Sequence, residues 1–226
     1  MADVVCIGAH PDDVEIGMGG TVAQMTAQGL DVVIVDLTDG EPTPHGTHDL
    51  RMAEAARAAH VLGAARMTLT LPNRYLFDSV EARTELAEVL RSLKPRVIFV
   101  PFPEDAHPDH IAAAAIARGA RFYAKFTKTE MSGTPHYPAR VYHYMAVHLR
   151  LVREPSFVVD ISKSVDVKLD ALRCYESQFR TNEANQGIVP MMEAAARMWG
   201  MQIGVTAGEP FFSAEPIGIR AVTDLV

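Results

Sequence analysis

The sequence has few cysteines, a single tryptophan and no long run of hydrophobic residues. Its two cysteines, Cys6 and Cys174, stand far apart and form no Cys-x-x-Cys pair. This pattern argues against a disulfide framework and against a cysteine zinc knuckle. We therefore expect both thiols to be buried core groups in a reducing compartment, and the protein to be cytoplasmic.

The chain also lacks the features of proteins that bind membranes or nucleic acids. Its hydrophobic runs fall well short of the roughly 18 residues that a membrane span needs, and residues 1–5 show no basic start of a signal peptide. The formal net charge is −7, whereas general nucleic-acid binding needs a basic surface. We expect no nucleic-acid partner and no membrane partner.

Two common motifs of enzymes and cofactor-binding proteins are missing as well. No Gly-x-Gly-x-x-Gly follows the first predicted strand, and the carboxylates of Asp12 and Asp13 would repel a dinucleotide phosphate there. No Gly-x-Ser-x-Gly elbow is present. A dinucleotide-binding module and a Ser-His-Asp hydrolase are therefore disfavoured.

What the sequence does contain is typical of a globular α/β domain. The 226 residues, 48% of them hydrophobic and 22% charged, suit a single domain spanning 1–226. Strand-like runs at 4–8, 32–35, 67–71 and 97–100 alternate with helical patterns at about 20–29, 47–62, 80–93 and 111–122. Further strands are predicted at 141–147 and 157–161, and further helices at 162–175, capped by Ser162, and 191–201. This alternation predicts a Rossmann-like, mostly parallel sheet flanked by helices in three αβα layers.

Acidic and histidine residues follow three of these predicted strands directly. They occupy residues 10–15 after the first strand, 39–41 after the second and 104–110 after the fourth. Ligands of parallel sheets bind beyond the carboxyl ends of the strands. We therefore expect all three segments to open onto the same edge of the sheet.

The first of these segments, Ala9-His10-Pro11-Asp12-Asp13, has the composition of a metal site. A tight turn could aim His10 and Asp13 at one point, and zinc accepts both imidazole nitrogen and carboxylate oxygen. An alternative interpretation is that an Asp simply caps the following helix. We favour the metal site because a cap needs one Asp and not a His with two.

The second segment, His107-Pro108-Asp109-His110, places two histidines three residues apart. Such a pair could supply one metal ligand and one further acid–base group. Together with His10 and Asp13 it would complete three protein ligands and leave a position open for water, which is the arrangement of catalytic rather than structural zinc sites.

Several motifs carry a resemblance to a known family. They are Ala9-His10-Pro11-Asp12-Asp13, Gly19-Gly20-Thr21, Leu37-Thr38-Asp39-Gly40-Glu41, Arg51-Met52-Ala53-Glu54, His107-Pro108-Asp109-His110, the run at 155–162, Tyr175-Glu176-Ser177-Gln178-Phe179 and Glu209-Pro210-Phe211. The sequence resembles the PIG-L/LmbE-like metal-dependent N-deacetylases over nearly its whole length. It is most similar to the branch typified by the bacillithiol-pathway deacetylases of N-acetylglucosaminyl malate.

The resemblance implies a role for each motif residue. His10, Asp13 and His110 would bind Zn2+, although Fe2+ or Co2+ would also suit these ligands. Asp12 would be the general base, and His107, oriented by Asp109, would donate a hydrogen bond or a proton to the oxyanion. Arg51 and Glu41 would contact the substrate.

The same resemblance implies a reaction and an assembly. The expected substrate is a small N-acetylated sugar such as N-acetylglucosamine or its malate conjugate, from which acetate is removed. A zinc amidase acting on a non-sugar amide, such as a thiol conjugate, is the alternative. Relatives often form homo-oligomers, so a trimer or hexamer is expected.

The sequence departs from the family pattern at positions that bear on the substrate. Asp39 stands where many relatives have Arg, which should disfavour anionic substrates. Asn73-Arg74 replaces Asp-Gly, and Met198 stands near a position where we expect tyrosine. Arg140 could brace Asp109 or lie on the surface. The other histidines are expected to be surface or internally satisfied groups: His45, His48, His60, His136, His143 and His148.

Overall fold

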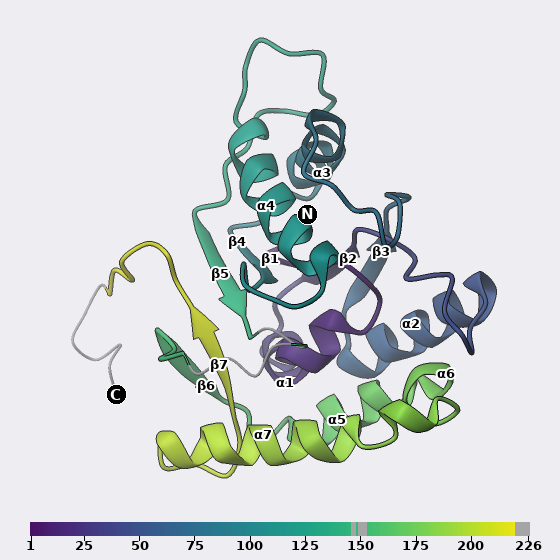
Figure 1. Ribbon diagram of the computed structural model, residues 1–226. Helices are drawn as coiled ribbons and strands as arrows, with labels where there is room; N and C mark the ends of the chain where they lie inside the picture. Colours follow the sequence, from purple (N-terminus) through teal and green to yellow (C-terminus); the bar gives the residue numbers. More distant parts are fainter. Residues whose placement is uncertain (146–147, 149–152, 220–226) are drawn as a thin grey trace.

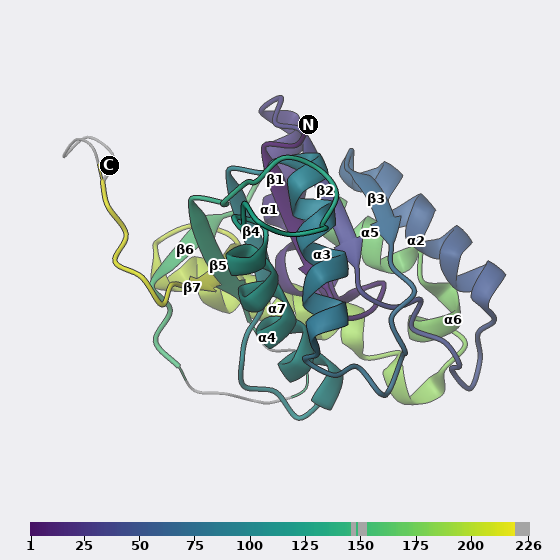
Figure 2. The same cartoon turned by 90° about the horizontal axis from the view of Figure 1, so that it is seen from above.

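The computed structural model describes residues 1–145, 148 and 153–219 of the chain. Within them, seven strands form one sheet in the order β3-β2-β1-β4-β5-β7-β6. Its parallel part, β3-β2-β1-β4-β5, runs from right to left in Figure 2. The strands are β1 (Val4–Gly8), β2 (Val32–Asp36), β3 (Ala65–Thr68), β4 (Val97–Pro101), β5 (Arg140–Tyr144), β6 (Phe157–Asp160) and β7 (Gly208–Phe212). Strands β1 to β5 pair in parallel, while β7 pairs antiparallel with both β5 and β6.

Helices cover both faces of this sheet, as the sequence predicts (Figure 1). They are α1 (Asp13–Ala27), α2 (His48–Leu62), α3 (Val80–Leu93), α4 (Pro108–Tyr123), α5 (Val165–Arg173), α6 (Glu176–Phe179), the 3-10 turn η1 (Glu183–Asn185) and α7 (Ile188–Gln202). Helices α3 and α4 pack on one face, and α1, α2 and α5 pack on the other. The expected α/β fold with a mostly parallel sheet is confirmed.

Each face of the sheet has its own hydrophobic core. Val4 and Cys6 of β1 point into the core with α1, α2 and α5, whereas Val5 and Ile7 point into the core with α3 and α4. Because both faces are covered, the central strands are continuous apolar runs and not alternating ones. Of the two cysteines expected to be buried, Cys6 is buried and Cys174 is partly exposed.

The first helix begins earlier than the sequence predicts. We expected it at about 20–29. The helix starts at Asp13 and is kinked at Met18, whose backbone is not helical. Here glycine serves close packing, since a Cβ on Gly20 would lie 2.7 Å from the Cδ1 atom of Ile161. The early start puts the acidic segment in the first turn of α1.

The C-terminal part of the described chain differs most from prediction. We did not predict β7, which contains Pro210 yet pairs on both sides. Ser162 does not cap a helix, because α5 begins after Ser164. The Oγ of Ser162 instead accepts hydrogen bonds from the backbone of Thr206 and Ala207. The predicted strand 141–147 ends at Tyr144, and residues 146–147 lie outside the described part.

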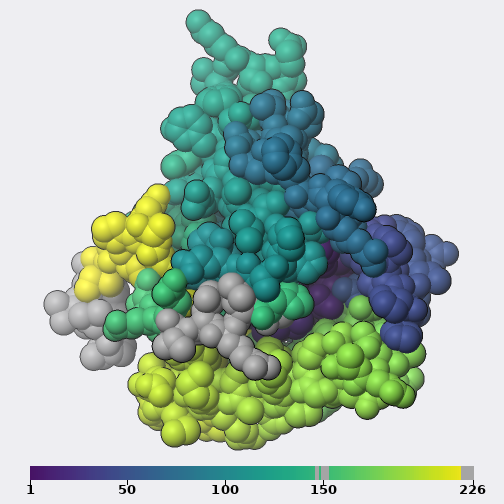
Figure 3. All heavy atoms as spheres, in the orientation of Figure 1, coloured from purple at the N-terminus to yellow at the C-terminus, as the bar shows by residue number. Residues whose placement is uncertain are grey.

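Helices α5, α6 and α7 form a base along the bottom of the molecule, in green and yellow-green in Figure 3. The base packs on α1, α2 and β7. No helix among the described residues is both long and apolar enough to cross a membrane.

Candidate metal centre

The turn between β1 and α1 brings the first acidic segment to the carboxyl edge of the sheet. Asp12 adopts a left-handed backbone with a φ of 104°, and its side chain makes no capping hydrogen bond. The alternative interpretation, an ordinary Asp cap, is therefore wrong. The Oδ2 atom of Asp13 accepts the backbone N–H groups of Ala9 and His10 at 2.9 and 3.0 Å, which fixes the turn. A strained non-glycine turn of this kind is common at functional sites.

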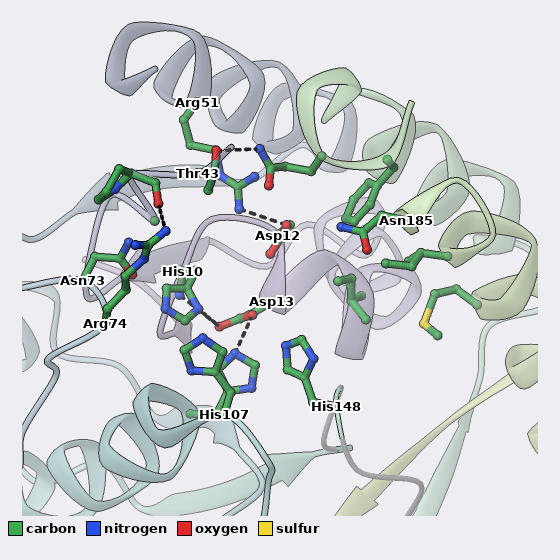
Figure 4. A pocket seen from close by; sticks show the side chains of 18 of the residues that line it. His10, Asp12, Asp13, Thr43, Arg51, Asn73, Arg74, His107, His148 and Asn185 are labelled. Atoms are coloured by element: carbon green, nitrogen blue, oxygen red, sulfur yellow. Dashed lines mark hydrogen bonds and ion pairs between the residues drawn. The ribbon is translucent and has the colours of Figure 1, made fainter. Parts of the chain in front are cut away.

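Three side chains predicted to bind metal converge at this turn (Figure 4). The Nδ1 atom of His10 lies 3.6 Å from Oδ2 of Asp13, and the Nε2 atom of His110 lies 3.2 Å from Oδ1 of Asp13. All three side chains are buried. The Nε2 atom of His110 is buried without an aligned hydrogen bond, although the Asp13 carboxylate lies within ion-pair distance of it. A shared divalent cation would satisfy these atoms, and the residues therefore fit a metal.

Each histidine of this group is held from behind by a second carboxylate. The Nε2 atom of His10 lies 3.1 Å from Oδ2 of Asp109, and the Nδ1 atom of His110 lies 2.8 Å from Oδ2 of Asp105. Carboxylates in this position fix the ring and the tautomer of metal-binding histidines. Sequence reasoning missed Asp105, although its place five residues before His110 in the same loop was a usable signal.

Asp109 has a different contact from the one expected of it. Its carboxylate binds His10 and accepts the backbone N–H groups of Arg74 and Leu76. It meets His107 only through its backbone N–H, which donates to Nδ1 of that ring at 3.2 Å. Because Nδ1 is an acceptor, the neutral His107 ring carries its proton on Nε2. Asp109 therefore sets the tautomer of His107 without touching it with its carboxylate.

Arg140, considered as a brace for Asp109, is not near it. Arg140 is exposed and its guanidinium contacts the carbonyl of the adjacent Ala139. The surface interpretation of Arg140 is therefore the correct one.

The pKa values of the metal-binding group reflect its crowding. Burial alone would lower the pKa of His10, but the carboxylates of Asp109 and Asp13 raise it to about 9. In the same way Asp13 and Asp105 outweigh burial and raise the pKa of His110 to about 10. The pKa of Asp13 lies well below its usual range, because both imidazoles outweigh its burial.

The pKa of Asp12 is shifted in the opposite direction from that of Asp13. Burial raises its pKa to about 6, and the guanidinium of Arg51 limits that rise. The Nη2 atom of Arg51 lies 2.9 Å from Oδ2 of Asp12 and also donates to the carbonyl of Pro11. A carboxyl group with a pKa near the working pH can both accept and return a proton.

Arg51 is itself positioned by a buried polar cluster. Its guanidinium carbon lies 5.3 Å from the centre of the Tyr175 ring, whose hydroxyl donates to Oε1 of Glu15 at 2.9 Å. Arg66 bridges Glu15 and Asp36. The Nε and Nη1 atoms of Arg51 are buried without a partner in the described structure.

The cluster opens into a cavity of about 480 Å³. Polar groups on its wall include Asp12, Thr43, Arg51, Asn73, Arg74, His107, His148, Gln178 and Asn185, and apolar groups are Ile16, Phe179, Ile188, Met191 and Met192. Glu41 is not among the described residues that line it, since its carboxylate accepts from the N–H and hydroxyl of Thr43. His148, grouped with the surface histidines above, does line the cavity.

Comparison with known proteins agrees with this geometry. The family described as PIG-L, GlcNAc-PI de-N-acetylase, matches residues 5–121. The chain is 34% identical over 192 residues to diacetylchitobiose deacetylase of Thermococcus kodakarensis, an alignment that covers 78% of this chain and 70% of the relative.

Solved structures show the same likeness over a longer stretch. The conserved protein TT1542 of Thermus thermophilus superposes with a TM-score of 0.91 and 38% identity, covering 98% of this chain and 99% of that one. The N,N'-diacetylchitobiose deacetylase of Pyrococcus horikoshii, determined with its inhibitor MPG, gives a TM-score of 0.80 and 27% identity, covering 100% and 89%. From its sequence, its fold and its edge-of-sheet histidine–carboxylate cluster, the chain belongs to the PIG-L family of de-N-acetylases.

Proposed function

We propose that this protein is a zinc-dependent deacetylase that removes the acetyl group from a small N-acetylglucosamine-type sugar. The observation that carries the proposal is the cluster of His10, Asp13 and His110, in which both imidazoles are held by carboxylates from behind. The Thermococcus and Pyrococcus relatives, whose names give diacetylchitobiose as substrate, support an amino-sugar amide.

Two nitrogens and one carboxylate oxygen are a donor set that suits Zn2+ and would also accept Fe2+ or Co2+. A bound ion of this kind would lower the pKa of water and polarise the acetyl carbonyl. Proton transfer and hydrogen bonding to the acetyl oxygen would be carried out by side chains of the protein itself.

Asp12 is the proposed proton carrier. Its carboxylate lies beside the cluster and binds none of the three candidate ligands, so it is free to accept a proton from the attacking water. Because its pKa is about 6, it can hold that proton and return it to the departing amine, which leaves poorly without one. Arg51 keeps the Oδ2 atom of Asp12 in place.

His107 is the proposed hydrogen-bond donor to the acetyl oxygen. Its Nδ1 atom accepts from the Asp109 backbone, which leaves the N–H on Nε2, the nitrogen available to a substrate. Burial, together with His10 and His110, lowers the pKa of His107 and keeps the ring neutral near pH 7. A fixed donor facing developing negative charge stabilises the transition state.

The cavity wall offers hydroxyl-binding groups for the sugar. Arg51, Thr43 and Gln178 lie together on the side of α2 and α6. We propose that Arg51 faces the sugar and that Glu41 acts on it indirectly, by fixing Thr43. A volume of about 480 Å³ is in the range of small-molecule sites. A single catalytic domain over 1–226, a trimeric or hexameric homo-oligomer and a cytoplasmic location complete the proposal.

The test is acetate release from N-acetylglucosamine, its malate conjugate and diacetylchitobiose, with metal-free and zinc-loaded protein. Zinc-dependent release that collapses in Asp12→Ala supports the proposal and ranks the substrates. Release from none of the three, while one equivalent of zinc stays bound, would contradict the sugar substrate and favour the amidase alternative.

A further inference from the structure

His148 is a cavity-lining imidazole to which the mechanism above gives no role. It follows β5, whose carboxyl end opens on the same edge of the sheet as those of β1 and β4. Figure 4 shows it on the other side of Asp13 from His10. The parallel sheet thus delivers a histidine from a third strand to the candidate metal centre.

The His148 ring lies against two histidines of the centre. Its centroid is 5.2 Å from that of His110, a candidate metal ligand, and 5.5 Å from that of His107. His107 and His110 are themselves stacked at 4.8 Å. The three ring centroids lie within 5.5 Å of one another, so an oxygen atom next to the metal ligand His110 would be within reach of both the His107 and the His148 imidazoles.

The hydrogen bonding of His148 differs from that of His143 and His136. The Nδ1 atom of His143 pairs with the carbonyl of Pro101, and the Nε2 atom of His136 pairs with the carbonyl of Pro95. Such bonds are typical of histidines with a structural role. Among the described residues, the ring nitrogens of His148 have no hydrogen-bond partner, although the ring lines the cavity.

The wall near α1 and α7 has few alternatives for a polar substrate group. Ile16, Ile188, Met191 and Met192 offer no hydrogen-bond donor there. An imidazole carries at least one N–H in every protonation state, so its capacity to donate does not depend on pH.

We propose that His148 is a further catalytic residue, whose ring N–H donates a second hydrogen bond to the acetyl oxygen, alongside the bond from His107. The inference rests on the proposed deacetylase function, and it assigns no metal-binding role to His148. Two donors at one oxygen would share the developing charge, as the paired donors of oxyanion holes do.

The experiment compares His148→Ala and His148→Gln with the wild type and with His60→Gln, a matched change of an exposed histidine on α2. Loss of one oxyanion donor costs about 100- to 1000-fold in kcat where no metal shares the charge. Here we expect a smaller loss, about 10- to 100-fold in kcat for His148→Ala, with KM changed little. His148→Gln retains an N–H donor and should recover part of the loss.

Two further readouts separate this inference from the proposed function. Bound zinc is counted in each variant, and the affinity for a methylphosphonamide of glucosamine, a tetrahedral mimic of the reacting acetyl group, is measured by calorimetry. We expect one zinc in every variant and an affinity about 10- to 100-fold weaker in His148→Ala.

Unchanged kcat and unchanged phosphonamide affinity in His148→Ala would overturn the inference, and so would loss of zinc, which would make His148 a ligand. If wild-type protein hydrolyses none of the sugars, the proposed function fails. The inference is then decided by the phosphonamide alone: weaker binding to His148→Ala supports the donor role, and equal binding refutes it.

Discussion

Replacing Asp105 with asparagine should weaken zinc binding while the fold is retained. Oδ2 of Asp105 accepts from Nδ1 of His110 at 2.8 Å, and this contact is buried. The carboxylate orients the ring and makes its other nitrogen more basic, and an amide oxygen can do the first but not the second. Loss of such a partner typically reduces metal affinity about 10- to 100-fold, or about 1.4 to 2.7 kcal/mol.

The assay is competition for zinc with a chromophoric chelator at fixed pH. The matched control is Asp39→Asn, because Asp39 forms a similar contact with His48 at 3.0 Å on the exposed rim. Melting temperatures of both variants show whether they are folded. Wild-type zinc affinity in Asp105→Asn, or an equal loss in Asp39→Asn, would refute the assignment of Asp105 as the support of His110.

Three further results are expected. Zinc must displace protons from His10 and His110, whose pKa values in the metal-free protein are about 9 and 10. Below pH 8 the affinity for zinc, measured by calorimetric titration, should therefore fall as the pH falls, by up to about 100-fold per pH unit. Weaker dependence than tenfold would contradict the raised pKa values. Arg51→Met removes the cation that holds down the pKa of Asp12, so the acidic limb of kcat/KM should move to higher pH; an unmoved limb would exclude Asp12 as the titrating base. Gly20→Val places a branched side chain against Ile161, which follows β6. The free energy of unfolding, measured in urea, should fall by at least about 1 to 3 kcal/mol. An unchanged stability would show that α1 can shift to make room.

Much of the fold could be predicted because its central strands are apolar runs ended by glycine, proline or acidic residues. The carboxyl-edge rule then placed segments from β1, β2 and β4 together without knowledge of their contacts. The antiparallel strand β7 escaped prediction because Gly208 and Pro210 are rare inside strands. The early start of α1 escaped because glycines that serve close packing resemble glycines that end helices.

The candidate site, too, could be predicted only in part. His10, Asp13 and His110 share two short motifs, and the structure brings their ligand atoms together. Contacts that depend on tertiary structure could not be derived from spacing. The Asp109 carboxylate contacts His10, which is 99 residues away in the sequence, and does not contact the neighbouring His107 ring. His148 lies outside both motifs and beyond the end of β5, so motif spacing could not place it at the cavity.

The most direct test of the account is a crystal of the zinc-loaded protein measured on both sides of the zinc absorption edge. The account predicts one anomalous peak, between Nδ1 of His10, the carboxylate of Asp13 and Nε2 of His110. A peak elsewhere, or no peak in crystals of protein that carries one equivalent of zinc in solution, would contradict the assignment of this cluster as the metal centre.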